Sequence, residues 1–154
     1  MKLLAWVVVL VGCLAAFAQT GFPKADGLAS TTSYSHVVVS SPGKLVFVAG
    51  QVANDPEGKI VGKGDLRAQT VQVFENLKKA LAAGGATFDD VVKINWYVKN
   101  FKTEMLPTLR EVRSMYVKKS PPASTLVGVA ALANDDYLLE VEAVASLPGK
   151  SGAK

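Results

Sequence analysis

VVKINWYV (residues 91–98) alternates apolar and polar side chains. A period of two residues predicts a β-strand with one buried face and one polar face. The apolar set is Val92, Ile94, Trp96 and Val98, and the polar set is Lys93, Asn95 and Tyr97. We therefore expect Trp96 in the core, beneath whatever element covers this strand.

Helical signals lie on both sides of this strand. Residues 66–83 carry apolar side chains at helical spacing, and Asp65 is placed to cap the N-terminus of that helix. Gly84 and Gly85 end it. Thr87 and Asp90 have the spacing of a capping box, which predicts one further helical turn.

A second helix is predicted after the strand. Thr103 is its expected N-cap, and Pro107 is tolerated in the first turn. PPAST (121–125) then precedes an apolar run that predicts a strand over 125–131.

Three more strands complete the expected domain, over 34–40, 44–50 and 137–147. The first two are expected to pair through the turn SPG (41–43). The order β-β-α-β-α-β-β predicts an α+β fold: a mixed β-sheet with two helices packed on one face.

Residues 1–18 have the pattern of an export signal. Lys2 precedes an uncharged apolar run that ends in Ala16-Phe17-Ala18, which predicts cleavage after Ala18 and a periplasmic or extracellular protein. A rival interpretation takes LVGC as a lipobox, so that a lipidated Cys13 would hold the protein at a membrane. A buried first helix fits less well, because the run has no polar face.

The remaining chain divides into a Gly-, Ala- and Ser-rich linker (19–32), one domain (33–148) and a flexible tail (149–154). Cys13 is the only cysteine and there is one histidine, so we expect no disulfide framework, no metal and no cofactor. The formal charge is +4 and the basic residues are scattered among acidic ones. This distribution argues against a nucleic-acid partner.

Three stretches together carry a family resemblance: VFVAGQV (46–52), DDVVKINWYVKNF (89–101), and PPAST followed by LEVEAVA (139–145). In this order they resemble the reactive intermediate deaminase A family (RidA, also called YjgF). The resemblance implies a chorismate-mutase-like fold and a homotrimer with ligand clefts between subunits. It also implies hydrolysis, without a cofactor, of reactive enamines and imines such as 2-aminoacrylate to 2-keto acids and ammonia.

The resemblance assigns roles to four residues. Glu142 falls on the glutamate that positions the attacking water, and Gly50 and Gln51 match a Gly-Gln pair whose backbone faces the cleft. Tyr34 matches a tyrosine near the first strand. Spacing alone instead favours Glu142 and Glu140 as two solvent-facing carboxylates on one face of a strand.

Three positions depart from the family pattern. Ser124 stands where members have the arginine that binds the substrate carboxylate, and Ala49 stands where many have serine. Arg110 falls where typical members have a cleft-facing asparagine, and Arg113 lies within the apolar stripe of the same predicted helix. Either arginine could replace the missing one, or both could extend to the surface.

These features predict a RidA-like hydrolytic deaminase of small enamines or imines, with a substrate altered by the loss of the arginine. The alternative is a non-catalytic module that keeps the cleft to bind a small molecule or a protein. A ribonuclease is disfavoured by the weak, scattered positive charge.

Overall fold

The computed structural model describes residues 20–23, 26, 32, 35, 37–40 and 43–149. The predicted export signal with Cys13, most of the linker, Tyr34 and residues 150–154 lie outside the described residues. Within the described part, no helix has the length and hydropathy needed to cross a membrane.

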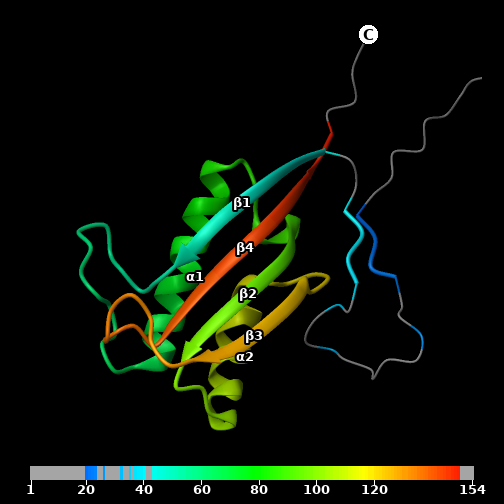
Figure 1. Ribbon diagram of the computed structural model, residues 1–154. Helices are drawn as coiled ribbons and strands as arrows, with labels where there is room; N and C mark the ends of the chain where they lie inside the picture. Colours follow the sequence, from blue (N-terminus) through cyan, green and yellow to red (C-terminus); the bar gives the residue numbers. More distant parts are fainter. Residues whose placement is uncertain are drawn as a thin grey trace, which may run out of the picture.

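The described residues form a four-stranded sheet in the order β1-β4-β2-β3 (Figure 1). The pair β2–β3 is parallel, whereas β4 is antiparallel to both of its neighbours. The predicted mixed sheet is therefore confirmed. The strands are β1 (Gly43–Gln51), β2 (Val91–Lys99), β3 (Ala123–Val129) and β4 (Leu139–Pro148).

Two helices, α1 (Leu66–Ala83) and α2 (Leu106–Tyr116), lie behind the same face of this sheet, as predicted (Figure 1). The Asp65 carboxylate caps α1 by accepting from the Ala68 N–H at 3.0 Å. The Thr87–Asp90 capping box is also present and starts a 3₁₀ turn, η1 (Phe88–Asp90).

The predicted cap at Thr103 is wrong. Thr103 begins a short 3₁₀ helix, η2 (Thr103–Met105), and α2 starts after it with no side-chain cap. The chain needs no such cap because η2 leads directly into α2: its C-cap, Leu106, already has helical φ and ψ. Pro107 does lie in the first turn of α2.

The strand predicted over 34–40 is not formed among its described residues. Val39 exchanges two backbone hydrogen bonds with Gly21, at 2.8 and 2.9 Å, in an isolated bridge. Ser35 bonds instead to Pro121 and Pro122, just before β3. These backbone groups have other partners, so they do not extend the sheet beside β1.

The core lies between the helices and the sheet, and its centre is Phe74 of α1. The Phe74 ring has its centroid 5.2 Å from that of Trp96 and 5.1 Å from that of Tyr116. Trp96 is 4% exposed, which confirms its predicted place in the core. Burial begins at Val91 and not at Val92, because the pairing with β4 shifts between Val91 and Lys93.

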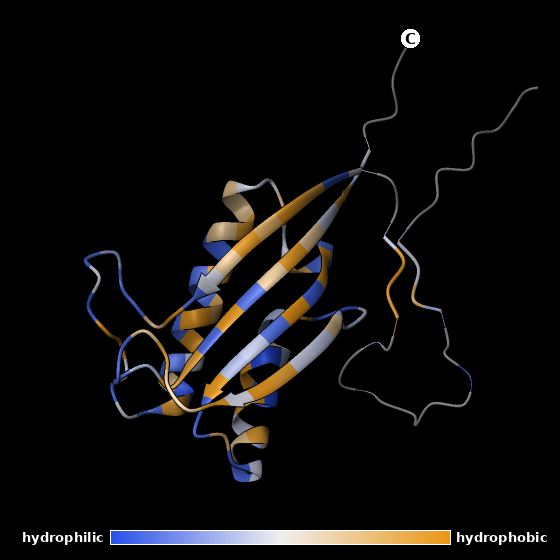
Figure 2. Cartoon of the chain, in the orientation of Figure 1, coloured by the Kyte–Doolittle hydropathy of each residue, from blue (hydrophilic) through white to orange (hydrophobic). Residues whose placement is uncertain are grey.

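Among the described residues, no helix covers the other face of the sheet, and polar and apolar residues alternate along its strands (Figure 2). We call this the open face. Phe47 and Leu45 of β1 alternate with buried Val46 and Val48, and they are 75% and 47% exposed.

Candidate functional site

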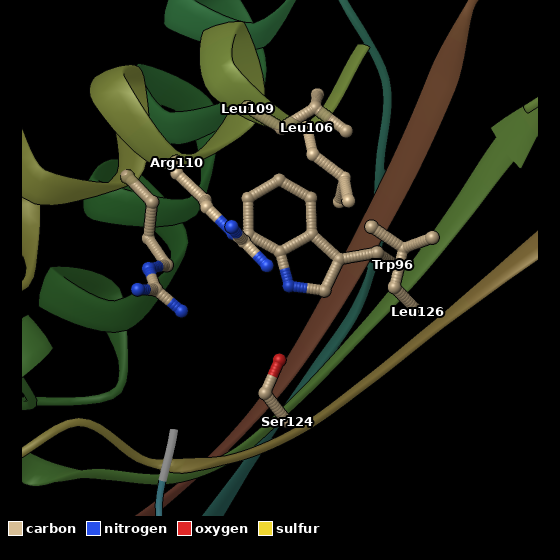
Figure 3. Close-up of a pocket in the computed structure, with 7 residues that line it drawn as sticks. Trp96, Leu106, Leu109, Arg110, Ser124 and Leu126 are labelled. Atoms are coloured by element: carbon tan, nitrogen blue, oxygen red, sulfur yellow. The ribbon is translucent and has the colours of Figure 1, made fainter. Parts of the chain in front are cut away.

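A pocket of about 170 Å³ lies between α2 and the strands β2 and β3 (Figure 3). We call it the α2 pocket. Because Ser124 pairs with buried Ile94 and Leu126 pairs with buried Trp96 across the parallel β2–β3 ladder, both β3 side chains face the helices. The lining is Trp96, Leu106, Leu109, Arg110, Arg113, Ser124 and Leu126.

The polar groups of this pocket are hydrogen-bond donors. Figure 3 shows the Ser124 hydroxyl, the indole nitrogen of Trp96 and the guanidinium of Arg110 turned toward the same space. None of the described residues that line the pocket is Asp or Glu. A space lined by cations and N–H or O–H groups is complementary to an anion, above all to a carboxylate.

The two arginines reinforce this charge. Burial lowers the pKa of Arg113, and the nearby positive charge of Arg110 lowers it further. Guanidinium groups stay charged in proteins, so the two like charges repel one another at the pocket. A bound anion would relieve that repulsion.

The last two residues of PPAST thus lie on opposite faces of the sheet. Ser124 lies in the α2 pocket, whereas Thr125 lies on the open face and accepts a hydrogen bond from Lys93 Nζ at 2.6 Å. The structure therefore brings together the predicted residues Ser124, Arg110 and Arg113.

The predicted residues of β1 and β4 lie elsewhere. Gly50 is in contact with the side chain of Glu140, whose carboxylate occupies the space that a Cβ on Gly50 would need. None of the described residues donates a hydrogen bond to Glu140. The family resemblance gives the water-positioning role to Glu142, two residues farther along β4.

Glu142 has two donors. Its Oε1 accepts from Asn95 Nδ2 at 2.7 Å and from the Tyr97 hydroxyl at 3.1 Å. The hydrogen bond to Glu142 is the main reason that the pKa of Tyr97 is raised. Glu142 also lines a hollow on the open face with Ala49. Both hydrogen bonds fall on Oε1 of Glu142, whereas none of the described residues donates to either carboxylate oxygen of Glu140.

Gln51 turns its side chain onto its own strand. Its Nε2 donates to the carbonyl oxygen of Ala49 at 3.0 Å and weakly to that of Gly50 at 3.4 Å. Of the predicted substrate contacts, Tyr34 is outside the described residues. Its neighbour Ser35 donates to the Pro121 carbonyl oxygen at 2.6 Å, close along the chain to Ser124.

Within one chain, the residues of the α2 pocket lie apart from Gly50 and Glu140. Gly50 is on β1 and Ser124 is on β3, and these are the outer strands of the sheet. Ser124 also faces the helices, whereas Glu140 alternates with buried Leu139 and Val141 and faces the open side. One chain alone therefore does not join the anion-binding pocket to Glu140.

No three His, Cys, Asp or Glu side chains of the described residues are grouped so that they could hold a metal ion. Sequence reasoning missed two functional candidates, Glu140 at Gly50 and the N–H of Trp96. The alternation in LEVEAVA places Glu140 and Glu142 on one face, but it does not tell which of them reaches Gly50.

Comparison with known proteins gives consistent matches. The family model described as Endoribonuclease L-PSP matches residues 24–147. A RutC family protein of Pyrococcus abyssi is 42% identical over 103 residues, which cover 67% of this chain and 79% of the relative. A 2-iminobutanoate/2-iminopropanoate deaminase of Dermatophagoides farinae is 30% identical over 102 residues, covering 66% and 77% of the two chains.

The solved structure of YyfB from Yersinia pestis, of the conserved Rid protein family, is similar to this chain with a TM-score of 0.79 and 35% identity. The match covers 84% of this chain and 100% of that one. It confirms the predicted fold class.

Proposed function

Because the chain belongs to the RidA (YjgF) family, we propose that it hydrolyses a small imine or enamine that carries a carboxylate, releasing ammonia and a carbonyl compound. The observation that carries this proposal is the α2 pocket, which gathers donors from Arg110, Ser124 and Trp96 and has no acidic lining. One relative bears the name of an imino-acid deaminase.

Arg110 takes over the binding of the substrate carboxylate. The family arginine is replaced by Ser124, whose hydroxyl can donate one hydrogen bond but cannot neutralise a charge. The Arg110 guanidinium enters the same pocket from α2 and can donate two parallel, charge-assisted hydrogen bonds. The anchor is thus moved from the strand to the facing helix.

Glu140 is the better placed of the two carboxylates to activate water. The oxygen of water bonds to the imine carbon, and Glu140 accepts the proton that water loses. Glu140 passes that proton to the imine nitrogen, which gives a carbinolamine. It then moves the hydroxyl proton to the nitrogen as the C=O bond forms and the C–N bond breaks, so that imine and water become a carbonyl compound and ammonia. The Glu140 carboxylate lies against Gly50 and accepts no hydrogen bond from the described residues, so both of its oxygens can accept from water, whereas Glu142 already accepts two hydrogen bonds.

A second copy of the chain completes the site. The α2 pocket and Glu140 lie at different strands and on different faces, so we propose that neighbouring subunits of a homotrimer contribute one each. The exposed Phe47 and Leu45 on the open face supply apolar surface for such an assembly.

The test measures ammonia release from imino acids generated in place by an amino-acid oxidase. We expect the wild-type protein to accelerate release over buffer, and Arg110→Ala to lose about tenfold or more of that acceleration. Arg67→Ala is the matched control, since Arg67 forms an exposed ion pair with Glu111 at 2.9 Å. If the wild-type protein accelerates release from no imine, the non-catalytic binding module takes the place of the enzyme.

A further inference from the structure

The α2 pocket has a polar end and an apolar end. Figure 3 shows the indole nitrogen of Trp96 on the side of Ser124, and the six-membered ring of the indole toward Leu106 and Leu109. Leu126 lies at the other side of the ring. A ligand that fills this space must therefore combine a compact anion with an apolar tail.

Trp96 presents a hydrogen-bond donor to the polar end of the pocket. The residue is only 4% exposed, yet none of the described residues accepts a hydrogen bond from its indole N–H, which faces the pocket. The N–H is thus open to the pocket and can donate a hydrogen bond to an acceptor that binds there. Its neighbours at that place are the Ser124 hydroxyl and the Arg110 guanidinium.

The size of the pocket limits the ligand. At about 170 Å³ it is smaller than the ~300 Å³ at which pockets for drug-sized molecules begin. A single amino-acid skeleton fits this scale, and a nucleotide or a peptide does not. The leucine side chains offer no polar group to a substrate whose own side chain is short.

We propose that the α2 pocket selects imino acids with a branched or aromatic apolar side chain over the smallest ones, such as 2-aminoacrylate. This inference rests on the proposed function and names its substrate class. The carboxylate lies on Arg110, Ser124 and the Trp96 N–H, and the side chain lies against Leu106, Leu109 and Leu126. Each buried methylene tightens binding by about fourfold.

The test uses 2-oxo acids, which are stable and keep both the carboxylate and the side chain of the imine. In a Trp6→Phe variant of the full chain, Trp96 is the only tryptophan, so its fluorescence reports binding directly. We expect 4-methyl-2-oxopentanoate to bind at least about tenfold more tightly than pyruvate. Arg110→Ala should weaken the binding of both acids.

Leu126→Ala separates the apolar contact from the charge. It should reduce the preference for 4-methyl-2-oxopentanoate to about threefold or less and leave pyruvate unchanged. Val127→Ala is the matched control, because Val127 is the next residue on β3, is 42% exposed and does not line the pocket. Equal affinity for the two acids, or an unchanged preference in Leu126→Ala, would overturn the inference.

The binding assay and the ammonia assay can fail separately. Selective binding of 4-methyl-2-oxopentanoate without ammonia release would support the proposed ligand class and contradict the proposed deaminase activity. Ammonia release with no preference between the two acids would retain the deaminase and remove the proposed selectivity.

Discussion

Glu140 and Gly50 are in direct contact, and the Glu140 carboxylate fills the space that any side chain on Gly50 would need. The contact lies where β1 and β4, which pair in register up to Val48, shift before Gln51. A side chain at position 50 would therefore displace the carboxylate of Glu140.

Gly50→Ala should therefore displace Glu140 and lower ammonia release by about tenfold or more. The new Cβ would meet the flexible end of a glutamate, so the fold should be kept, as checked by circular dichroism. Gly21→Ala is the control, since nothing lies within 4 Å of a Cβ there. Full activity in Gly50→Ala would mean that the position of Glu140 is irrelevant.

An arginine at position 124 of β3 should restore activity that is lost when Arg110 of α2 is replaced by alanine. Ser124→Arg alone adds a third guanidinium beside Arg110 and Arg113, so like-charge repulsion should limit its gain on 2-aminoacrylate. In the double variant Ser124→Arg with Arg110→Ala, that repulsion is reduced. We expect kcat/KM of the double variant to exceed that of Arg110→Ala alone by at least about tenfold. No recovery would show that Arg110 does not act as the anchor.

The assembly should depend on Phe47. Phe47→Asp places a charge at the most exposed large apolar residue of the open face and should convert the trimer to monomers, as measured by light scattering. Met115→Asp tests the specificity of this effect, because Met115 is 40% exposed on α2. A wild-type protein that is monomeric at micromolar concentration would contradict the shared site.

Stability should fall at alkaline pH through Tyr116. Burial, with a hydrogen bond to Glu75 at 2.8 Å, raises the pKa of Tyr116 from 10.0 to about 12. A raised folded-state pKa means that the contribution is complete below pH 10.0 and is lost as pH rises toward about 12. Urea unfolding of wild type and Tyr116→Phe should thus differ less at about pH 11.5 than at about pH 8. An equal difference in the free energy of unfolding at the two pH values would contradict the raised pKa of Tyr116.

Local patterns in the sequence were enough for the helices and for most of the strands. The stripe of residues 66–83 predicts the buried face of α1, and Thr70, Val73, Phe74, Leu77 and Leu81 are indeed buried. The alternation in 91–98 likewise places Trp96 in the core. These features depend on the spacing of apolar residues along a single segment, which the sequence shows directly.

The site depends on pairing between distant segments, which the sequence does not display. Glu140 and Glu142 lie on the same face of β4, and the alternation of β4 alone does not tell that Glu140 is the one that contacts Gly50 beside the register shift between Val48 and Gln51. In β3, Leu126 and Val127 are both apolar, so the pattern does not tell which face Ser124 takes. The strand predicted over 34–40 fails for a similar reason, because Val39 pairs with Gly21.

The most direct test of the account compares Glu140→Gln with Glu142→Gln on one imino acid, by the rate of ammonia release. Both substitutions keep size and remove the charge, and the two residues lie on the same face of β4. The account predicts that Glu140→Gln loses about a hundredfold or more in kcat, as expected for a general base, while Glu142→Gln loses less than about tenfold. The reverse order, with Glu142→Gln inactive and Glu140→Gln near wild type, would contradict it.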